Sequence, residues 1–439
     1  MHYINMGKKI SIIGLGKLGS PMVAAYAEKG YSVIGVDVNQ EYVAKINEGK
    51  APVSETDLVD CLERNKENIS ATTDYREAVL NSDISFIIVP TQSKEDGDFS
   101  TDYVVRAGEE IGKVLKEKSD FHLVVLVSTV TPCSTERYLL KALEESSGKK
   151  CGEDFGLCYN PEFIALGSVI YNLLNPDFVL IGESDSRSGD ILESFYKNFC
   201  NGASIKRMNI VNAEITKISL NTFVTTKISY ANMLAELCEK IPGGNVDAVT
   251  DALGFDERIG HKYLKGGVGY GGPCFPRDNR ALICTAKKYN VELPIAEATD
   301  KINKNQIPRI VERITSLISD KDTVGILGLS YKIDTNVIEE SQGVEIARIL
   351  TDGGIEVIAY DPAAIKNAKE VLGERVSFSS SLRDCLLNSD LSVIITPWPE
   401  FKEIKPEDLK EGSRILDCWR MLDSNKFKDK YLSIGIYHE

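Results

Sequence analysis

The segment with the strongest chemical character is Gly266–Asp278, whose sequence GGVGYGGPCFPRD places a single cysteine, Cys274, in a glycine-rich loop. Glycines let the backbone bend sharply and approach a ligand closely. Three residues after the cysteine, the cation Arg277 can stabilise a thiolate, and the next residue, Asp278, has a carboxylate that can carry a proton. The pattern predicts a reactive thiol at Cys274, and the alternative is an inert cysteine in a tight turn.

A glycine turn near the N-terminus has the context of a dinucleotide site. Lys8–Ile13 is expected to form a strand, Ser20–Lys29 a helix, and Tyr31–Val36 a second strand that ends at Asp37. In such a unit the turn meets a pyrophosphate, and the acid accepts hydrogen bonds from the adenosine ribose. A carboxylate at that place repels a 2′-phosphate, so NAD is favoured over NADP. The cofactor-binding residues predicted from this pattern are Gly14, Gly16, Lys17, Leu18, Gly19 and Asp37.

Length and composition limit the remaining possibilities. A chain of 439 residues predicts two or three domains. The net charge of −14 disfavours nucleic acid or an anionic membrane as the main partner. Ten cysteines without a CxxC pair indicate reduced thiols and no metal site. No apolar run approaches the roughly 20 residues of a membrane span, so a cytoplasmic protein is expected.

An internal repeat predicts the fold class. Asn81–Thr91 and Asn388–Trp398 are identical at seven of eleven positions, and both are expected to be buried strands. A second glycine turn begins at Gly328, with Ser330 in place of its second glycine, and a later strand again ends on an acid, Asp361. We therefore expect an α/β protein with two Rossmann-like, doubly wound parallel-sheet domains. The serine indicates that the second one binds something other than a dinucleotide.

The two halves are expected to be joined by a helical domain. Asn212–Lys240 has helical periodicity, and Lys217 and Asn221, four residues apart, share one face of that helix. The predicted domains are an NAD-binding domain at 1–208, a central helical domain with the cysteine loop at 209–305, and a C-terminal Rossmann-like domain at 306–439.

These elements together resemble the UDP-glucose/GDP-mannose dehydrogenase family over nearly the whole chain. The glycine turn alone is generic, whereas the cysteine loop and the NPEF element are specific motifs. The segments that carry the resemblance are GLGKLG, Asp37, Pro90-Thr91, Ser128-Thr129-Val130, Asn160-Pro161-Glu162-Phe163, Lys217 with Asn221, GGPCFPRD, and Gly328–Lys332. The resemblance implies an N-terminal NAD domain, a central domain that forms a homodimer, and a C-terminal domain that holds the nucleoside diphosphate of a nucleotide sugar.

The implied reaction is a four-electron oxidation of the sugar at C6 to a uronate. It uses two NAD and proceeds through a thiohemiacetal and a thioester on Cys274. By resemblance, the catalytic residues are Cys274, Lys217, Asn221, Asp278, Glu162 and Thr129. Further NAD contacts fall on Pro90, Thr91, Ser128, Thr129 and Arg277, and substrate contacts on Phe163, Ile164, Lys217, Asn221, Arg258, Tyr263, Gly271, Tyr331 and Lys332.

UDP-glucose is the favoured substrate, because the branch that acts on N-acetylated hexosamines commonly has a histidine before the cysteine. A UDP-N-acetylhexosamine or GDP-mannose remains an alternative. A single-oxidation β-hydroxyacid-type enzyme, or a non-catalytic NAD-binding protein, would not require Cys274. The sequence departs from the family pattern at two places in the C-terminal domain. Glu339 stands where the family has an arginine. Asp417-Cys418-Trp419 stands where the family has Asp-Gly-Arg, and an arginine, Arg420, follows one position later.

Overall fold

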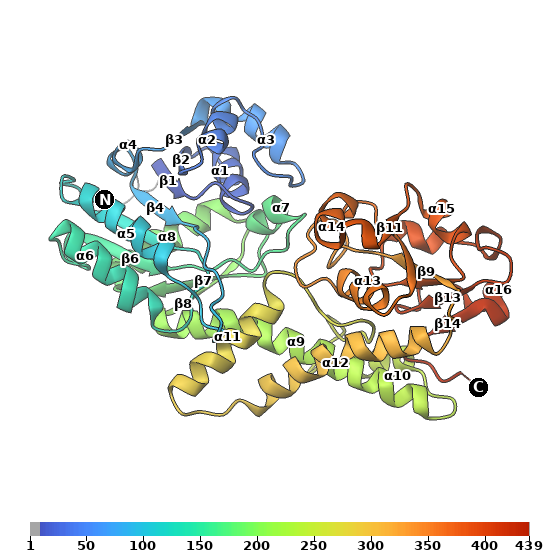
Figure 1. Cartoon of the computed structure of the whole chain (residues 1–439). Coiled ribbons are helices and arrows are strands. Elements are labelled where there is room, and N and C mark those ends of the chain that lie inside the picture. Colours follow the sequence, from blue (N-terminus) through green and yellow to red (C-terminus); the bar gives the residue numbers. More distant parts are fainter. Residues whose placement is uncertain (1–8, 439) are drawn as a thin grey trace. The chain divides into compact units, whose positions relative to one another are not determined.

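The computed structural model describes residues 9–438, and the chain divides into two compact units at Ser219. Each unit contains one sheet, and each is described by itself below (Figure 1). None of the helices in residues 9–438 has the length and apolar character that a membrane span requires.

The first unit is built on an eight-stranded sheet with the order β3-β2-β1-β4-β5-β6-β7-β8. Neighbouring strands are parallel except β6 and β7, which pair antiparallel. Antiparallel strands are often added at the edge of a parallel sheet, and here the change lies beyond the six strands of the Rossmann order. The strands are β1 (Lys9–Ile13), β2 (Ser32–Val36), β3 (Ile69–Thr72), β4 (Ile84–Ile87), β5 (His122–Leu126), β6 (Phe155–Tyr159), β7 (Phe178–Glu183) and β8 (Ser204–Asn209).

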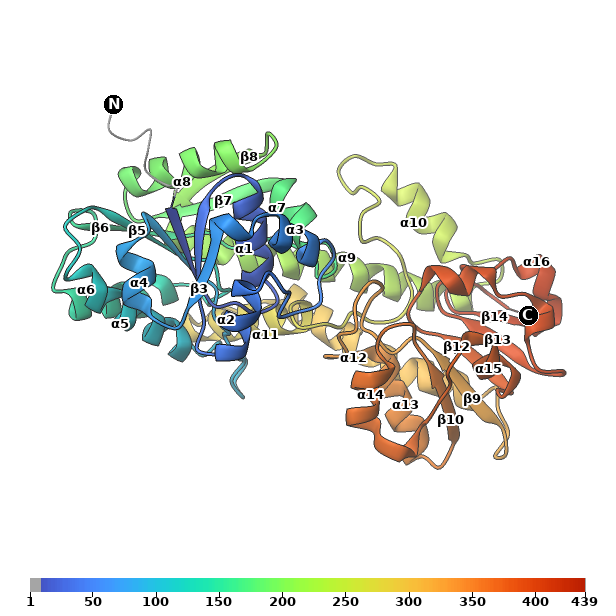
Figure 2. The ribbon, with the colours of Figure 1, turned by 90° about the horizontal axis from the view of Figure 1, so that it is seen from above.

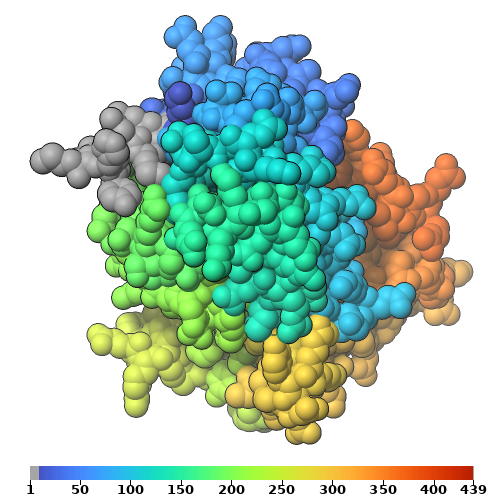
Figure 3. Space-filling model, turned by 90° about the vertical axis from the view of Figure 1, so that its left-hand side faces the viewer, coloured from blue at the N-terminus to red at the C-terminus, as the bar shows by residue number. Residues whose placement is uncertain are grey.

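Helices cover both faces of this sheet. One face packs against α1, α2, α3, α7 and α8, and the other packs against α4, α5, α6 and the start of α9. Helices α5 and α6, coloured cyan to teal, face the viewer in the space-filling view of Figure 3. The helices are α1 (Gly19–Glu28), α2 (Gln40–Asn47), α3 (Leu58–Arg64), α4 (Tyr75–Leu80), α5 (Asp102–Leu115), α6 (Lys141–Ser147), α7 (Val169–Leu174), α8 (Ser186–Phe199) and α9 (Ile210–Lys240), with a π-helical segment, η3 (Thr135–Leu140), before α6.

The second unit contains a wholly parallel six-stranded sheet with the order β11-β10-β9-β12-β13-β14. Ranked along the chain, its strands have the same 3-2-1-4-5-6 order as the first six strands of the other sheet. The strands are β9 (Thr323–Leu327), β10 (Glu356–Tyr360), β11 (Ser377–Phe378), β12 (Leu391–Ile394), β13 (Arg414–Asp417) and β14 (Tyr431–Ser433).

Helices α12, α13 and α14 pack on one face of the second sheet, and α15 and α16 pack on the other (Figure 2). The helix predicted over Asn212–Lys240 is confirmed as α9, which runs across the boundary between the units. The remaining helices are α10 (Val246–Gly254), α11 (Phe275–Lys288), α12 (Pro294–Thr315), α13 (Gln342–Asp352), α14 (Ile365–Leu372), α15 (Leu382–Leu387) and α16 (Ser424–Phe427), with short 3-10 turns η2 (Lys66–Asn68), η4 (Gly373–Arg375), η5 (Pro399–Glu403), η6 (Pro406–Asp408) and η7 (Lys428–Lys430).

The two copies of the sequence repeat occupy equivalent places in the two sheets. The first copy contains β4, which pairs with β1, and the second contains β12, which pairs with β9. Asp83 and Asp390, at the same position in the repeat, accept a hydrogen bond from the first backbone N–H of the neighbouring strand, at Lys9 and Thr323 respectively. The prediction of two Rossmann-like domains is therefore confirmed.

Candidate active site

The N-terminal glycine turn has the geometry that binding a pyrophosphate requires. Gly14 has a φ of +104°, and a Cβ atom there would lie 2.3 Å from the carbonyl oxygen of Ile88. At Gly19, where α1 begins, a Cβ would lie 1.8 Å from the carbonyl oxygen of Gly14. A Cβ at Gly16 would meet nothing within 4 Å, so the backbone is open to a ligand at this position. Lys17 and Leu18 complete the turn at the start of α1.

Asp37 follows β2 and braces this turn. Its Oδ2 accepts a hydrogen bond from the backbone N–H of Leu15 at 2.7 Å, and its Oδ1 accepts one from that of Asn39 at 2.8 Å. A carboxylate offers about four lone-pair sites, so two backbone bonds leave capacity for ribose hydroxyls.

The glycine turn that begins at Gly328 has the same close backbone contacts as the N-terminal turn, but it contains an insertion before the helix that follows. A Cβ at Gly328 would lie 2.4 Å from the backbone nitrogen of Thr396, and a Cβ at Gly343 would lie 2.1 Å from the carbonyl oxygen of Gly328. Gly343 is therefore the counterpart of Gly19, although 15 positions separate it from Gly328, compared with 5 between Gly14 and Gly19. The sequence pattern did not reveal Gly343, because no fixed spacing marks it.

Asp361, the counterpart of Asp37, has no capacity left for a ribose. It is 1% exposed, and its Oδ2 accepts hydrogen bonds from Leu329 N, from both the backbone N–H and the hydroxyl of Ser330, and from the indole of Trp398. Its Oδ1 is occupied by the backbone N–H groups of residues 363 and 364. These internal donors agree with the prediction that the second domain binds something other than a dinucleotide.

Other predicted residues follow the carboxyl ends of β4 and β5 in the first unit. The hydroxyl of Ser128 donates to Val89 O at 2.7 Å and accepts from Val89 N at 2.9 Å. The hydroxyl of Thr91 donates to Thr129 O at 2.8 Å. These bonds join the loops that carry Pro90, Thr91, Ser128 and Thr129 at the same edge of the sheet as the glycine turn.

Glu162 and Lys217 lie together in the first unit, where Glu162 follows β6 and Lys217 extends from α9. The ammonium Nζ of Lys217 donates to the backbone carbonyl of Glu162 at 2.7 Å and lies 4.7 Å from the centre of the Phe163 ring. Lys217 is 8% exposed, so its charge is largely shielded from water. Ile164, next along the chain, is half-buried. Phe163, Glu162 and Lys217 therefore form one cluster.

The Glu162 carboxyl is suited to proton transfer near neutral pH. Burial raises the pKa of Glu162 to about 7, while a hydrogen bond from Tyr196 and the Lys217 charge act in the opposite direction. A carboxyl with a pKa close to the working pH exchanges protons efficiently as an acid or a base.

The second unit contains the cysteine loop. Cys274 is exposed and stands immediately before α11, whose first turn contains Pro276 and Asp278. The partial positive charge of a helix N-terminus stabilises a thiolate there. The Asp278 carboxylate is 1% exposed, accepts from the Asn221 amide at 2.6 Å, and lies 3.7 Å from Nε of Arg277. Asp278 therefore lies one helical turn after Cys274, with Asn221 and Arg277 beside its carboxylate.

The insertion after Gly328 packs against this loop. A Cβ at Gly271 would lie 2.2 Å from the carbonyl oxygen of Glu340, and one at Gly272 would lie 2.4 Å from the Tyr331 ring. The backbone N–H of Gly272 donates to Glu339 O at 3.0 Å, so the residue that departs from the family contributes its backbone to this contact. Burial, and then the charges of Cys274 and Glu339, raise the pKa of Tyr331, which keeps its phenol neutral.

The other predicted substrate residues of the second unit differ in their surroundings. Arg258 is highly exposed and forms an ion pair with Asp256 two residues earlier. Tyr263 is 53% exposed with a φ of +65°, and its ring packs on Phe275 with centroids 6.3 Å apart. Lys332 is half-buried and follows Tyr331 in the insertion.

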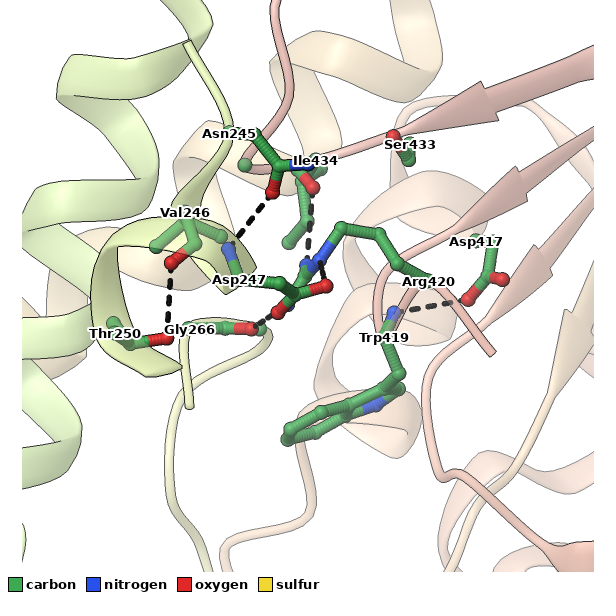
Figure 4. Close-up of polar contacts among 12 residues, drawn as sticks. Asn245, Val246, Asp247, Thr250, Gly266, Asp417, Trp419, Arg420, Ser433 and Ile434 are labelled. Carbon is green, nitrogen blue, oxygen red and sulfur yellow. Dashed lines mark hydrogen bonds and ion pairs between the residues drawn. The ribbon is translucent and has the colours of Figure 1, made fainter. Parts of the chain in front are cut away.

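Arg420 links separate segments of the second unit through its hydrogen bonds (Figure 4). Its guanidinium donates to both carboxylate oxygens of Asp247 at 2.7 and 2.8 Å, and to the backbone carbonyls of Gly266, Cys418 and Ile434. These bonds engage the full donor set of the side chain. Arg420 therefore fixes the start of the cysteine loop to α10 and to the C-terminal sheet.

Comparisons with known proteins identify the family. Models of the UDP-glucose/GDP-mannose dehydrogenase family match residues 8–200 as the NAD binding domain, 211–305 as the central domain and 325–424 as the UDP binding domain. The chain is 34% identical over 420 residues to the UDP-glucose 6-dehydrogenase AglM of Haloferax volcanii, covering 94% of this chain and 97% of that protein. It is 36% identical over 396 residues to the GDP-mannose 6-dehydrogenase of Pseudomonas aeruginosa, covering 88% and 89%.

The structure is also similar to a UDP-glucose dehydrogenase from Pyrobaculum islandicum, with a TM-score of 0.90, 31% identity and 98% coverage of each chain. The matched domains together span most of the chain, and the glycine turn fits a dinucleotide in both conformation and access. The chain therefore belongs to the UDP-glucose/GDP-mannose dehydrogenase family and is an NAD-dependent nucleotide-sugar 6-dehydrogenase.

Proposed function

We propose that this enzyme converts UDP-glucose to UDP-glucuronate through covalent intermediates on Cys274. The observation that carries this proposal is the exposed thiol at the N-terminus of α11, with the buried Asp278–Asn221 pair one helical turn away. An exposed, electrostatically supported thiol is suited to nucleophilic attack on an aldehyde.

The chemistry balances with two hydride transfers and one water. The first removes a hydride and a proton from the C6 alcohol to give an aldehyde. The Cys274 thiolate then adds to that aldehyde, and the resulting alkoxide is protonated to a thiohemiacetal. Loss of a second hydride and a proton leaves a thioester, which water cleaves to the carboxylate and the thiol. One alcohol, two NAD⁺ and one water thus give one carboxylate, two NADH and three protons.

The chain supplies the groups that this sequence needs. Lys217 stabilises the oxyanions that develop at C6, with the Asn221 amide as a second donor. Glu162 and Asp278 position the attacking water and take its proton, and Thr129 orients the water or the sugar. These roles are proposed from the family pattern together with the contacts and the Glu162 pKa described above.

NAD accepts the hydrides when it is bound. The residues present fit this cofactor because Gly16 leaves the turn open and the Asp37 carboxylate retains free lone pairs. We propose that Pro90, Thr91, Ser128 and Thr129 also contact it, since they follow strands at the same edge of the sheet, and we retain Arg277 as a cofactor contact.

UDP-glucose is proposed over a UDP-N-acetylhexosamine on the form of the cysteine loop, which has Pro273 and no histidine before the cysteine. Overall identity to the UDP-glucose and GDP-mannose relatives is similar, at 34% and 36%, so GDP-mannose remains the alternative. Incubation with a panel of UDP- and GDP-sugars, followed by NADH absorbance, tests this choice. We expect the highest kcat/KM with UDP-glucose. A higher value with GDP-mannose or a UDP-N-acetylhexosamine would reassign the substrate but leave the reaction class intact.

Each predicted region has a proposed task. Region 1–208 binds NAD, region 306–439 holds the nucleotide sugar, and region 209–305 carries the cysteine loop and pairs with a second copy of the chain. An exposed apolar stripe on α9 supports the last assignment. It contains Phe223, Tyr230 and Leu237, spaced seven residues apart, which are 68%, 46% and 53% exposed.

The stripe gives a testable prediction about assembly. Burying each large side chain contributes about 1.5–3 kcal/mol, whereas a buried unpaired charge is unfavourable. Tyr230→Glu should therefore convert a dimer into a monomer in light scattering coupled to size exclusion. Tyr171→Glu, which places the same charge at an exposed tyrosine of α7, should remain dimeric. A monomeric mass for the unmodified protein would contradict the assignment.

Asp37 gives a prediction about the cofactor. Its carboxylate should exclude a 2′-phosphate, so the unmodified enzyme should strongly prefer NAD. In Asp37→Ala the ratio of kcat/KM for NADP to that for NAD should rise about tenfold or more, equivalent to roughly 1.4 kcal/mol. The control is Glu41→Ala, which removes an exposed carboxylate of α2 that pairs with Lys45. Comparable use of both cofactors by the unmodified enzyme would refute the prediction.

A further inference from the structure

Tyr196 contacts Glu162, the residue proposed to transfer a proton. It lies on α8, a helix that contains none of the motifs that carry the family resemblance. The residue is 3% exposed, and its ring packs edge-on against Phe195 and Phe199, with centroid distances of 5.0 and 6.1 Å. Its hydroxyl lies 3.3 Å from Oε1 of Glu162 and contacts Oδ1 of Asn160 more closely, and the Tyr26 hydroxyl also interacts with it. The packing leaves this hydroxyl little freedom to move away from the carboxyl.

Asn160 anchors the hydroxyl to the sheet. Its backbone N–H donates to Leu126 O at 2.8 Å, and its side-chain NH₂ donates to Leu180 O at 2.8 Å. The amide nitrogen is therefore committed, which leaves the amide oxygen facing Tyr196. Since a phenol has one proton and can also accept a hydrogen bond, it can donate to an ionised Glu162 or donate to Asn160 while accepting from a protonated Glu162.

We propose that Tyr196 is a positioning residue for Glu162. Its hydroxyl, anchored by Asn160, holds Oε1 of the Glu162 carboxyl in place and forms a hydrogen bond with it in both protonation states of Glu162. The proposal rests on the proposed role of Glu162 as the group that takes a proton from water. It assigns Tyr196 no contact with the substrate or the cofactor.

The surroundings of Glu162 predict the effect of removing the hydroxyl. Within residues 9–438, the titratable groups that interact electrostatically with the carboxyl include Tyr26 from α1, Tyr196 from α8, Cys200 at the end of α8 and Lys217 from α9. Burial raises the Glu162 pKa to about 7, and the Tyr196 hydrogen bond and the Lys217 charge oppose that rise. Hydrogen bonds to an ionised group are roughly twice as strong as neutral ones, so the carboxylate loses more than the acid when the hydroxyl is removed.

Tyr196→Phe should therefore raise the pKa of Glu162. As Glu162 works as a carboxylate, the acidic limb of the kcat–pH profile should move about one pH unit upward. Activity at neutral pH should fall and recover at higher pH, while the KM values for NAD and sugar change little. The control is Tyr31→Phe, which removes a phenol that donates to Phe195 O and packs on the same Phe195 ring, without contacting Glu162. Its acidic limb should stay in place.

An unmoved limb in a folded Tyr196→Phe protein, with a uniform loss of rate, would overturn the inference. If that variant fails to fold, 3-fluorotyrosine at position 196 provides the test, because its more acidic phenol should shift the limb downward, and an unmoved limb again overturns the inference. Glu162→Gln separates the two levels of the argument. If this variant retains the acidic limb and full activity, the proposed role of Glu162 is wrong. If Glu162→Gln loses the acidic limb of the kcat–pH profile, but substitutions at Tyr196 leave that limb unmoved in the otherwise unmodified enzyme, only the role of Tyr196 is wrong.

Discussion

Replacement of Cys274 by alanine should abolish conversion of the nucleotide sugar to the uronate, with a loss in kcat of about 10⁴-fold or more, because the thiohemiacetal and the thioester both require the thiol. The thiol is exposed and stands just before α11. Its removal should therefore leave the thermal unfolding temperature and the affinities for NAD and sugar close to those of the unmodified enzyme. Steady-state NADH formation and calorimetric titration measure the two effects separately.

Cys274→Ser distinguishes loss of the nucleophile from loss of its leaving-group properties. A serine ester is hydrolysed more slowly than a thioester, so this variant should accumulate a covalent adduct whose mass exceeds that of the free protein. Cys151→Ala, which removes a partly exposed thiol of the first unit, is the control and should turn over normally. Full uronate formation by Cys274→Ala would exclude the covalent mechanism.

Lys217→Ala should lower kcat by roughly 10² or more, which is the scale of losing one oxyanion donor. The ammonium already lies against Glu162 O at 2.7 Å in a position that is only 8% exposed, so its charge acts with little solvent screening. Because the stabilised charge develops in the transition states, the KM values should change much less than kcat.

Two companion variants separate charge from packing at this position. Lys217→Met retains most of the side-chain volume and should lose about as much kcat as the alanine variant. Lys240→Met, which neutralises an exposed lysine at the end of the same helix, should have normal activity. Near-normal kcat in Lys217→Met would show that the lysine is a structural residue.

Local patterns predicted the parts of the fold that depend on local geometry. The glycine turn and Asp37 could be recognised because each position has its own steric or hydrogen-bonding requirement, which the contacts of Gly14, Gly19 and Asp37 show. The pair of Rossmann-like domains could be predicted from a repeated buried strand, since the strand next to β1 or β9 meets the same surroundings in each sheet.

Features that depend on tertiary contacts were beyond the sequence pattern. Gly343 makes the same close approach to its glycine turn as Gly19 does, but it follows an insertion whose length no pattern predicts. Asp361 accepts a hydrogen bond from the indole of Trp398, which is distant along the chain. Tyr196 lies on a helix among other aromatic residues, where nothing in its spacing distinguishes a core residue from a partner of Glu162. The antiparallel pairing of β6 and β7 likewise leaves no mark on short buried strands.

The yield of NADH per nucleotide sugar tests the central claim most directly. A limiting amount of UDP-glucose should be consumed with excess NAD, while NADH is followed by absorbance and the sugar product is identified by mass spectrometry. The thioester account predicts two NADH for each sugar, a uronate as the sole product and no released aldehyde. A yield of one NADH per sugar, with an aldehyde or keto sugar as product, would contradict the account and favour a single oxidation that does not use Cys274.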